Sequence, residues 1–183
     1  ISIQGLCSVY ARHYAEGIPV EVQRQYTLHD FLKRENILGQ QRVYEKRGKL
    51  EVQALQKARH VIGRTPWDFA CAQILAPRAE YHFCNETLRE PFYEGRWSYE
   101  SCQKHRIFAS SCDYPVKGFH YLLEALAEII QEYPDTTLAV PGKGFLKLDR
   151  NGRLHQDNYH RYLKNMAEQY GLTDKIEFLG KLS

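Results

Sequence analysis

The pattern of hydrophobic and polar residues predicts short buried strands that alternate with amphipathic helices. Between residues 119 and 133 the apolar residues recur at spacings of three and four, which is the period of a helix. Strands are predicted before it at 106–109 and after it at 137–140. A second helical pattern over 159–170 leads to a strand at 176–179. Strands that alternate with helices predict an α/β fold with a parallel sheet.

The N-terminal half shows the same alternation with shorter elements. We expect strands at 1–5, 60–63 and 79–84. The sequence Thr65-Pro66-Trp67-Asp68 provides an N-cap, a proline at the first helical position and a capping-box acid. A helix is therefore predicted to begin there and to run to about Leu75.

The polar stretch from residue 23 to 59 is predicted to be helical, with breaks near Gly39 and Gly48. Before it, the sequence Gly17-Ile18-Pro19-Val20 predicts a turn into another short strand. Basic residues are dense between Lys33 and Arg59, and such a stretch could contact an anionic membrane surface. Glutamates are interleaved with them, however, and this favours a solvated helix face with paired charges.

Composition narrows the class of protein. The chain is 43% hydrophobic and 26% charged, which is typical of a globular protein, and a net charge of +3 does not indicate nucleic-acid binding. The five cysteines have no Cys-x-x-Cys spacing, which argues against a disulfide framework or a zinc site. Because the chain begins at Ile1 and ends at Ser183 just after an apolar run, we expect an internal fragment of a longer protein.

The most distinctive loops follow the predicted strands. In parallel sheets, ligands bind beyond the carboxyl ends of the strands. There Lys117-Gly118 precedes a helix whose first turn has no carboxylate. Free N–H groups, the helix dipole and the lysine would together suit a phosphate group. The alternative interpretation is an ordinary strand-to-helix turn with a solvated lysine.

Several motifs occur in a characteristic order between residues 106 and 182. They are Lys117-Gly118, Leu122-Leu123-Glu124-Ala125, Tyr133-Pro134-Asp135, Gly142-Lys143-Gly144, Gly171-Leu172 and Ile176-Glu177-Phe178-Leu179-Gly180. This set resembles the retaining, nucleotide-sugar-dependent glycosyltransferases of GT-B fold, often called family 4 or group 1. The resemblance is less clear over residues 1–84.

The resemblance implies two Rossmann-like parallel-sheet domains, both incomplete in this chain. Residues 1–84 would be the rear part of an N-terminal, acceptor-side domain. Residues 85–105 would connect the domains, and 106–183 would be the front part of the nucleotide-sugar-binding domain.

The same resemblance implies a metal-independent hexosyl transfer, with retention, from a nucleotide diphosphate sugar to a glycan or lipid-linked acceptor. No cofactor is expected, and the fragment alone should be inactive. The usual setting of the family is bacterial surface polysaccharide or glycolipid synthesis. We therefore expect a cytoplasmic enzyme that could contact the inner face of the membrane.

Residue roles follow from the resemblance position by position. Lys117 would be catalytic, because it would bind the diphosphate and stabilise it as the leaving group. Ser111 stands near the place where many members have a second, cationic phosphate ligand. The remaining candidates are Gly118, Gly142, Lys181 and Leu182 around the donor, and Gln4 and Arg64 in the cleft.

Other functions remain open at the level of sequence. A non-catalytic α/β module that binds a nucleotide or sugar phosphate would share the same motifs, and the uncharged Ser111 keeps this alternative open. Another GT-B enzyme, such as a sugar epimerase, would share the architecture. A membrane-surface adaptor would use the basic stretch from Lys33 to Arg59.

Overall fold

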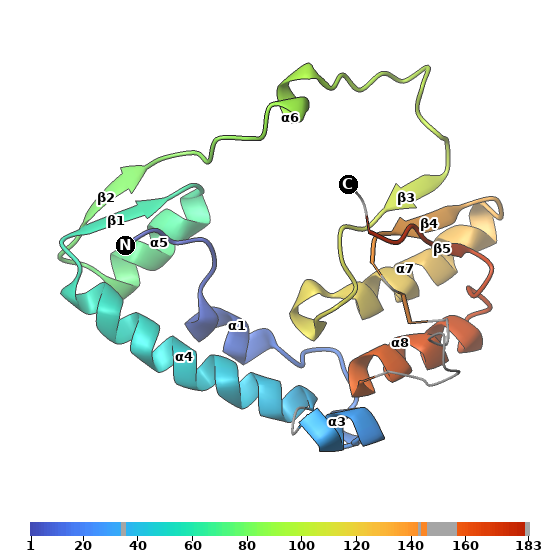
Figure 1. The fold of residues 1–183 in the computed structure, drawn as a ribbon, viewed down its shortest axis with the longest axis horizontal. Coiled ribbons are helices and arrows are strands. Elements are labelled where there is room, and N and C mark those ends of the chain that lie inside the picture. Colours follow the sequence, from blue (N-terminus) through green and yellow to red (C-terminus); the bar gives the residue numbers. More distant parts are fainter. Residues whose placement is uncertain (34–35, 143, 146–156, 182–183) are drawn as a thin grey trace. The chain divides into compact units, whose positions relative to one another are not determined.

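The computed structural model confirms a mixed α/β fold with parallel strands (Figure 1). It describes residues 1–33, 36–142, 144–145 and 157–181. Contacts divide the chain into two compact units, each built from two stretches of sequence. The first unit comprises residues 1–12 and 41–102, and the second comprises 13–40 and 103–183.

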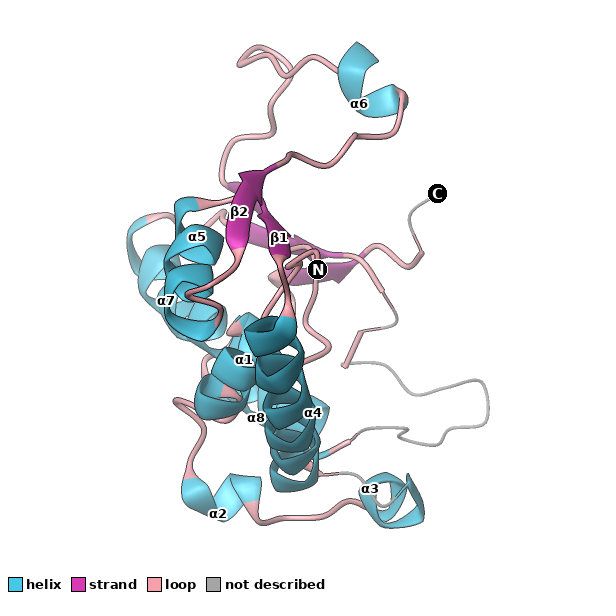
Figure 2. Ribbon diagram, turned by 90° about the vertical axis from the view of Figure 1, so that its left-hand side faces the viewer, coloured by secondary structure: helices cyan, strands magenta, loops and turns pink. Residues whose placement is uncertain are grey.

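The first unit contains a pair of parallel strands. Strand β1 (His60–Gly63) pairs with β2 (Glu80–Phe83), and the two lie side by side in Figure 2. The first residues of the chain continue the sheet, because Ile3 N–H donates to the Ile62 carbonyl at 2.8 Å. The helices of this part are α1 (Cys7–His13), α4 (Ile37–Lys57), α5 (Pro66–Leu75) and α6 (Pro91–Glu94). The core is formed by Ile3, Leu6, Leu55, Val61, Ala72 and Ala76.

Helix α4 is continuous, so the predicted breaks at Gly39 and Gly48 are wrong. A glycine inside a helix costs about 1 kcal/mol relative to alanine, but a Cβ at Gly48 would lie 2.6 Å from the Cα of Ser8. The glycine therefore permits the backbone of α1 to approach α4. Glu51 fixes this contact, because its carboxylate accepts from the N–H groups of Cys7 and Ser8 at 3.1 and 3.0 Å.

The start of α5 agrees with its sequence signals. The Thr65 hydroxyl accepts from the N–H of Asp68 at 3.1 Å, and the Asp68 carboxylate accepts from the N–H of Thr65 at the same distance. This reciprocal pair is a capping box, with Pro66 as the first helical residue.

The second unit contains a parallel sheet in the order β3-β4-β5. The strands are β3 (Arg106–Phe108), β4 (Thr137–Val140) and β5 (Ile176–Phe178). They alternate with α7 (Phe119–Glu132) and α8 (Asn158–Gln169), which contact each other. Large side chains in the core include Leu123, Leu126, Leu138, Val140 and Leu163.

Helix α8 ends as the sequence predicts. Gly171 adopts a φ of 66°, and Leu172 N–H donates to the Ala167 carbonyl at 2.7 Å. This is the Schellman arrangement, in which a residue without a Cβ penalty permits the left-handed turn.

By their contacts, residues 13–40 belong to the second unit. They form α2 (Val20–Gln23) and α3 (Leu28–Lys33). The strand predicted near Val20 is wrong, because Pro19 instead precedes a short helix. The boundaries at 84 and 105 stay a prediction for the whole protein. No helix in the described part of the chain is long and apolar enough to cross a membrane.

We predict that Thr65→Ala destabilises the start of α5 by about 1 kcal/mol, because one side-chain cap is lost. Hydrogen exchange of the α5 amides measures this effect. Thr65→Ser keeps the hydroxyl and serves as the matched control. Equal protection in the alanine variant and the wild type would show that the capping box contributes nothing.

Candidate functional site

The carboxyl ends of β4 and β5 meet in the second unit, as expected for parallel strands. Gly142 N–H donates to the Gly180 carbonyl at 2.7 Å. Gly142 has a φ of 103° and open space where a Cβ would stand. Lys181 follows directly and is exposed. The structure therefore brings two of the expected donor-binding segments together, while Leu182 lies outside the described residues.

Lys117 ends a short turn of 3-10 helix, η1 (Pro115–Lys117), that follows β3. Gly118 then adopts a left-handed φ of 70°, which glycine tolerates without strain. This conformation redirects the chain into α7, whose first turn contains no acidic residue. The Lys117 side chain is exposed and has no ion pair with another residue in the ranges the structure describes. It is therefore accessible to an anion.

The first turn of α7 has a partner that the sequence did not reveal. His120 is buried, its Nδ1 lies 3.1 Å from the Tyr159 hydroxyl, and its Nε2 lies 3.0 Å from the Glu16 carbonyl. Burial raises the pKa of Tyr159 well above its usual value, although the N–H groups of Phe119 and His120 act in the opposite direction. The hydroxyl therefore lies against N–H groups that we expected to be free for phosphate.

Ser111 is held by its own loop. Its hydroxyl lies 3.1 Å from a carboxylate oxygen of Asp113 and accepts from the Asp113 N–H at 3.2 Å. A donor phosphate would have to compete with these contacts. Ser111 is thus less available as a phosphate ligand than its sequence position indicated.

Gln4 and Arg64 lie together in the first unit. The Arg64 guanidinium donates to the Gln4 carbonyl at 3.2 Å and pairs with Glu86 at 2.8 Å. Asp68 instead accepts from the Arg64 backbone N–H. Burial alone would raise the pKa of Asp68, but donors from Arg64 and Thr65 lower it overall. The charge of Arg64 is therefore already partly compensated by Glu86.

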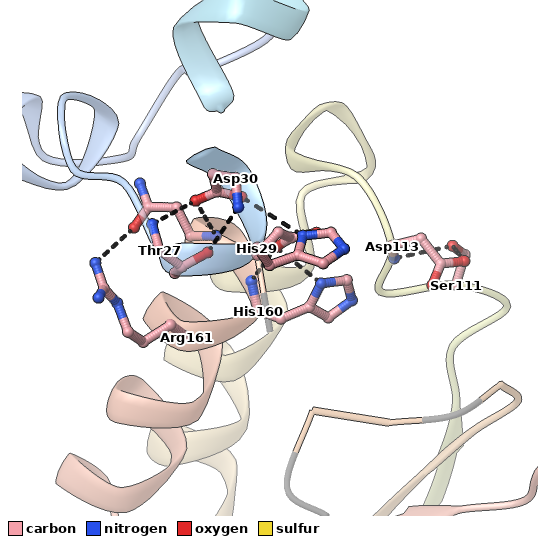
Figure 3. Close-up of polar contacts among 9 residues, drawn as sticks. Thr27, His29, Asp30, Ser111, Asp113, His160 and Arg161 are labelled. Atoms are coloured by element: carbon pink, nitrogen blue, oxygen red, sulfur yellow. Dashed lines mark hydrogen bonds and ion pairs between the residues drawn. The ribbon is translucent and has the colours of Figure 1, made fainter. Parts of the chain in front are cut away.

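A small cavity of about 120 Å³ lies in the second unit, between the loop after β3 and the start of α8. Its lining includes Asp30, Asp113, Tyr114, Asp157 and Asn158. Figure 3 shows the polar contacts around it, where Asp30 accepts from the N–H groups of Thr27 and Asn158 at 2.8 and 3.0 Å. No local pattern in the sequence marks this cavity, because its walls are more than 100 residues apart in the chain.

His160 pairs with Asp157, which lines the cavity, through its Nδ1 at 2.9 Å. Burial lowers the pKa of His160, but Asp157 and Cys112 outweigh that effect and raise it to about 10. Cys112, Asp113 and His160 offer ligand atoms that all lie within 4.8 Å of one another.

A second group of ligand atoms occurs in the first unit. His60, Glu80 and His82 lie on the paired strands β1 and β2, with 3.0 Å between the Nδ1 of His60 and the Nε2 of His82. All three side chains are exposed. Exposed acidic groups are common in proteins without a bound ion.

Comparison with known proteins supports the expected class. Residues 101–183 match the family model described as "Glycosyl transferases group 1". The match covers β3, α7, β4, α8 and β5, and so includes Lys117. No curated protein and no solved structure matches the chain. The C-terminal part thus has the features of a glycosyltransferase domain, a class that binds a nucleotide sugar and an acceptor.

We predict that His120 stays neutral when the pH falls below its ordinary pKa of 6.5, because burial lowers the pKa of this imidazole. The unfolded chain takes up a proton there and the folded chain does not. The stability that the neutral His120 contributes to the fold is therefore complete above pH 6.5. It is lost as the pH falls toward the lowered pKa of His120 in the folded chain.

Histidine ring NMR during a pH titration measures the protonation of His120 directly. In denaturant unfolding, His120→Gln should reduce the loss of stability on acidification. The exposed His82→Gln should leave that loss as in the wild type. Titration of the His120 ring at or above pH 6.5 would contradict the prediction.

Proposed function

We propose that this chain is part of an enzyme that transfers a hexosyl group from a nucleotide diphosphate sugar, with retention, to a glycan or lipid-linked acceptor. The observation that carries the proposal is the family match over residues 101–183, which contains Lys117 on an accessible turn. Synthesis of a surface polysaccharide or glycolipid is the proposed setting.

Lys117 is the proposed catalytic residue. The transition state of glycosyl transfer resembles an oxocarbenium ion, so negative charge grows on the departing diphosphate. A fixed cation beside that charge stabilises the transition state more than the ground state. Gly118 and the 3-10 turn hold the backbone of Lys117 in one conformation, which reduces the reorganisation needed during the reaction.

The other donor contacts rest on backbone geometry. Gly142 and Gly180 place two strand ends together, and the open space at Gly142 would admit a ligand close to the main chain. We propose that Gly142 and Lys181 contact the nucleotide there. Leaving-group stabilisation by Lys117 requires no divalent cation, and we therefore propose that transfer does not depend on magnesium.

We predict that Lys117→Ala in the full-length protein lowers kcat by about 100-fold or more, because a preorganised charge at the leaving group is lost. Release of nucleotide diphosphate from a panel of nucleotide sugars measures turnover, with and without added magnesium. Lys164→Ala removes a lysine that pairs with Glu168 on α8, and it should leave turnover unchanged.

Thermal-shift measurements with nucleotide diphosphates provide a second readout on the same variants. Stabilisation of the wild type that is lost in Lys117→Ala would support the assigned role. Turnover within a few-fold of wild type in Lys117→Ala would remove Lys117 from the mechanism. Binding without turnover of any nucleotide sugar would favour a non-catalytic module.

Helix α3 favours an additional contact with the membrane. Leu28, Phe31 and Leu32 are 76%, 72% and 74% exposed, and Lys33 follows them. Large apolar side chains next to a basic residue suit the boundary between headgroups and acyl chains. We propose that this face contacts an anionic bilayer or the lipid of an acceptor.

We predict that the double variant Phe31→Ser and Leu32→Ser reduces flotation of the full-length protein with anionic vesicles. Trp67, on α5, is 45% exposed, so Trp67→Ser provides a control for loss of an apolar side chain elsewhere. Equal flotation of the double variant and the wild type would exclude α3 from membrane contact.

A further inference from the structure

The loop between β3 and α7 contains a buried thiol next to an imidazole. Cys112 is only 2% exposed, and His160 reaches it from the first turn of α8. Figure 3 shows the His160 ring on the side of α8 that faces Ser111 and Asp113. The residues are separated by 48 positions in the sequence, so the fold and not a local motif brings them together.

The side chains of Cys112, Asp113 and His160 are of the types that bind zinc in proteins. A thiolate, an imidazole and a carboxylate are the three ligand types that zinc accepts in proteins. In a tetrahedral zinc site the ligand atoms lie about 3.3–3.8 Å apart, given bond lengths of about 2.0–2.3 Å. The ligand atoms of the three side chains all lie within 4.8 Å of one another, and they would move closer together on binding an ion.

The surroundings of the ligands also fit a metal site. Asp157 holds the Nδ1 of His160 at 2.9 Å, which leaves Nε2 for a metal. A carboxylate on the distal nitrogen of a metal-binding histidine orients the ring and raises its basicity. Asp113 is likewise held by the Ser111 hydroxyl through one oxygen, so its other oxygen remains for an ion.

The neighbouring cavity offers a route of entry and a free coordination position. Its volume of about 120 Å³ admits an ion with water, and both Asp113 and Asp157 line it. A zinc ion with three protein ligands keeps its fourth position for water. Of the three proposed ligands, Asp113 lines the cavity, so the open position would lie on the side of Asp113, and Cys112 is buried away from solvent.

We propose that Cys112, Asp113 and His160 bind a zinc ion, with Asp157 as the residue that positions His160. The ion would join the loop that precedes Lys117 to the start of α8. This binding site goes beyond the proposed transfer reaction, in which the ion takes no part. The absence of Cys-x-x-Cys spacing argued against a zinc site. Such spacing indicates only those zinc sites whose ligands are close in sequence, and His160 is not close to Cys112.

The test measures zinc content and cobalt spectra in the full-length protein. Elemental analysis after dialysis should find stoichiometric zinc in the wild type. The apoprotein titrated with Co²⁺ should show a thiolate-to-cobalt charge-transfer band and the visible bands of a tetrahedral ion. Cys112→Ser should lose the charge-transfer band, and His160→Gln should lose most of the affinity.

Asp157→Asn keeps an N-cap oxygen on α8 but removes the carboxylate, and it should weaken zinc binding by about 10–100-fold. Three matched controls should leave the spectrum unchanged. Cys102→Ser removes a partly buried thiol outside the site, His105→Gln removes a histidine paired with Asp135, and His82→Gln removes one histidine of the exposed group on β1 and β2. Circular dichroism confirms that each variant is folded.

A wild type that holds no zinc and shows no thiolate band with Co²⁺ would overturn the proposal. A band that persists in Cys112→Ser, or metal that is lost only in His82→Gln, would do the same. Neither readout uses a nucleotide or a sugar. A negative zinc result would therefore not contradict the proposed transfer reaction, and absence of transfer would not contradict the zinc site.

Discussion

A single buried carboxylate organises the second unit. Asp30 is 1% exposed and accepts from the backbone N–H of Thr27, just before α3, and of Asn158 at the start of α8. Each contact is charge-assisted, and the helix dipole of α8 adds to the attraction. Because a buried carboxylate without these donors would be costly, residues 13–40 and α8 are held in one arrangement. The position of Asp157 and His160 beside the loop after β3 follows from this constraint.

His120, in the first turn of α7, connects this helix to residues 13–40. Its ring links the Glu16 carbonyl to the Tyr159 hydroxyl, and the buried hydroxyl lies at the first turn of α7. The start of α7 and the start of α8 are therefore coupled through side chains in the core. This coupling leaves Lys117, one residue before the Gly118 N-cap, as an exposed charge on a fixed backbone.

Features that depend on neighbouring residues could be predicted from the sequence. The capping box at Thr65 and Asp68, the turn at Gly171 and the alternation of strands with helices all arise from local conformational preference or from periodicity. The close approach of Ser8 to Gly48, and of His160 to Cys112, depends on contacts between distant segments. A single sequence contains no signal for such contacts. The same limit explains why the N–H groups at the start of α7 were expected to be free.

The loop between β3 and α7 combines an exposed lysine side chain with an anchored backbone. In the proposed transfer reaction Lys117 would have to be exposed to meet a diphosphate, and exposed lysines are usually mobile, which weakens any stabilisation they give. Here the turn carrying Lys117 is fixed on one side by the left-handed Gly118 and on the other by the buried Pro115 and Cys112. In the proposed reaction, the entropy of ordering the loop backbone would therefore be offset during folding and not at the moment of catalysis. Burial of Pro115 and Cys112 anchors the backbone of this turn, while the Lys117 side chain stays exposed.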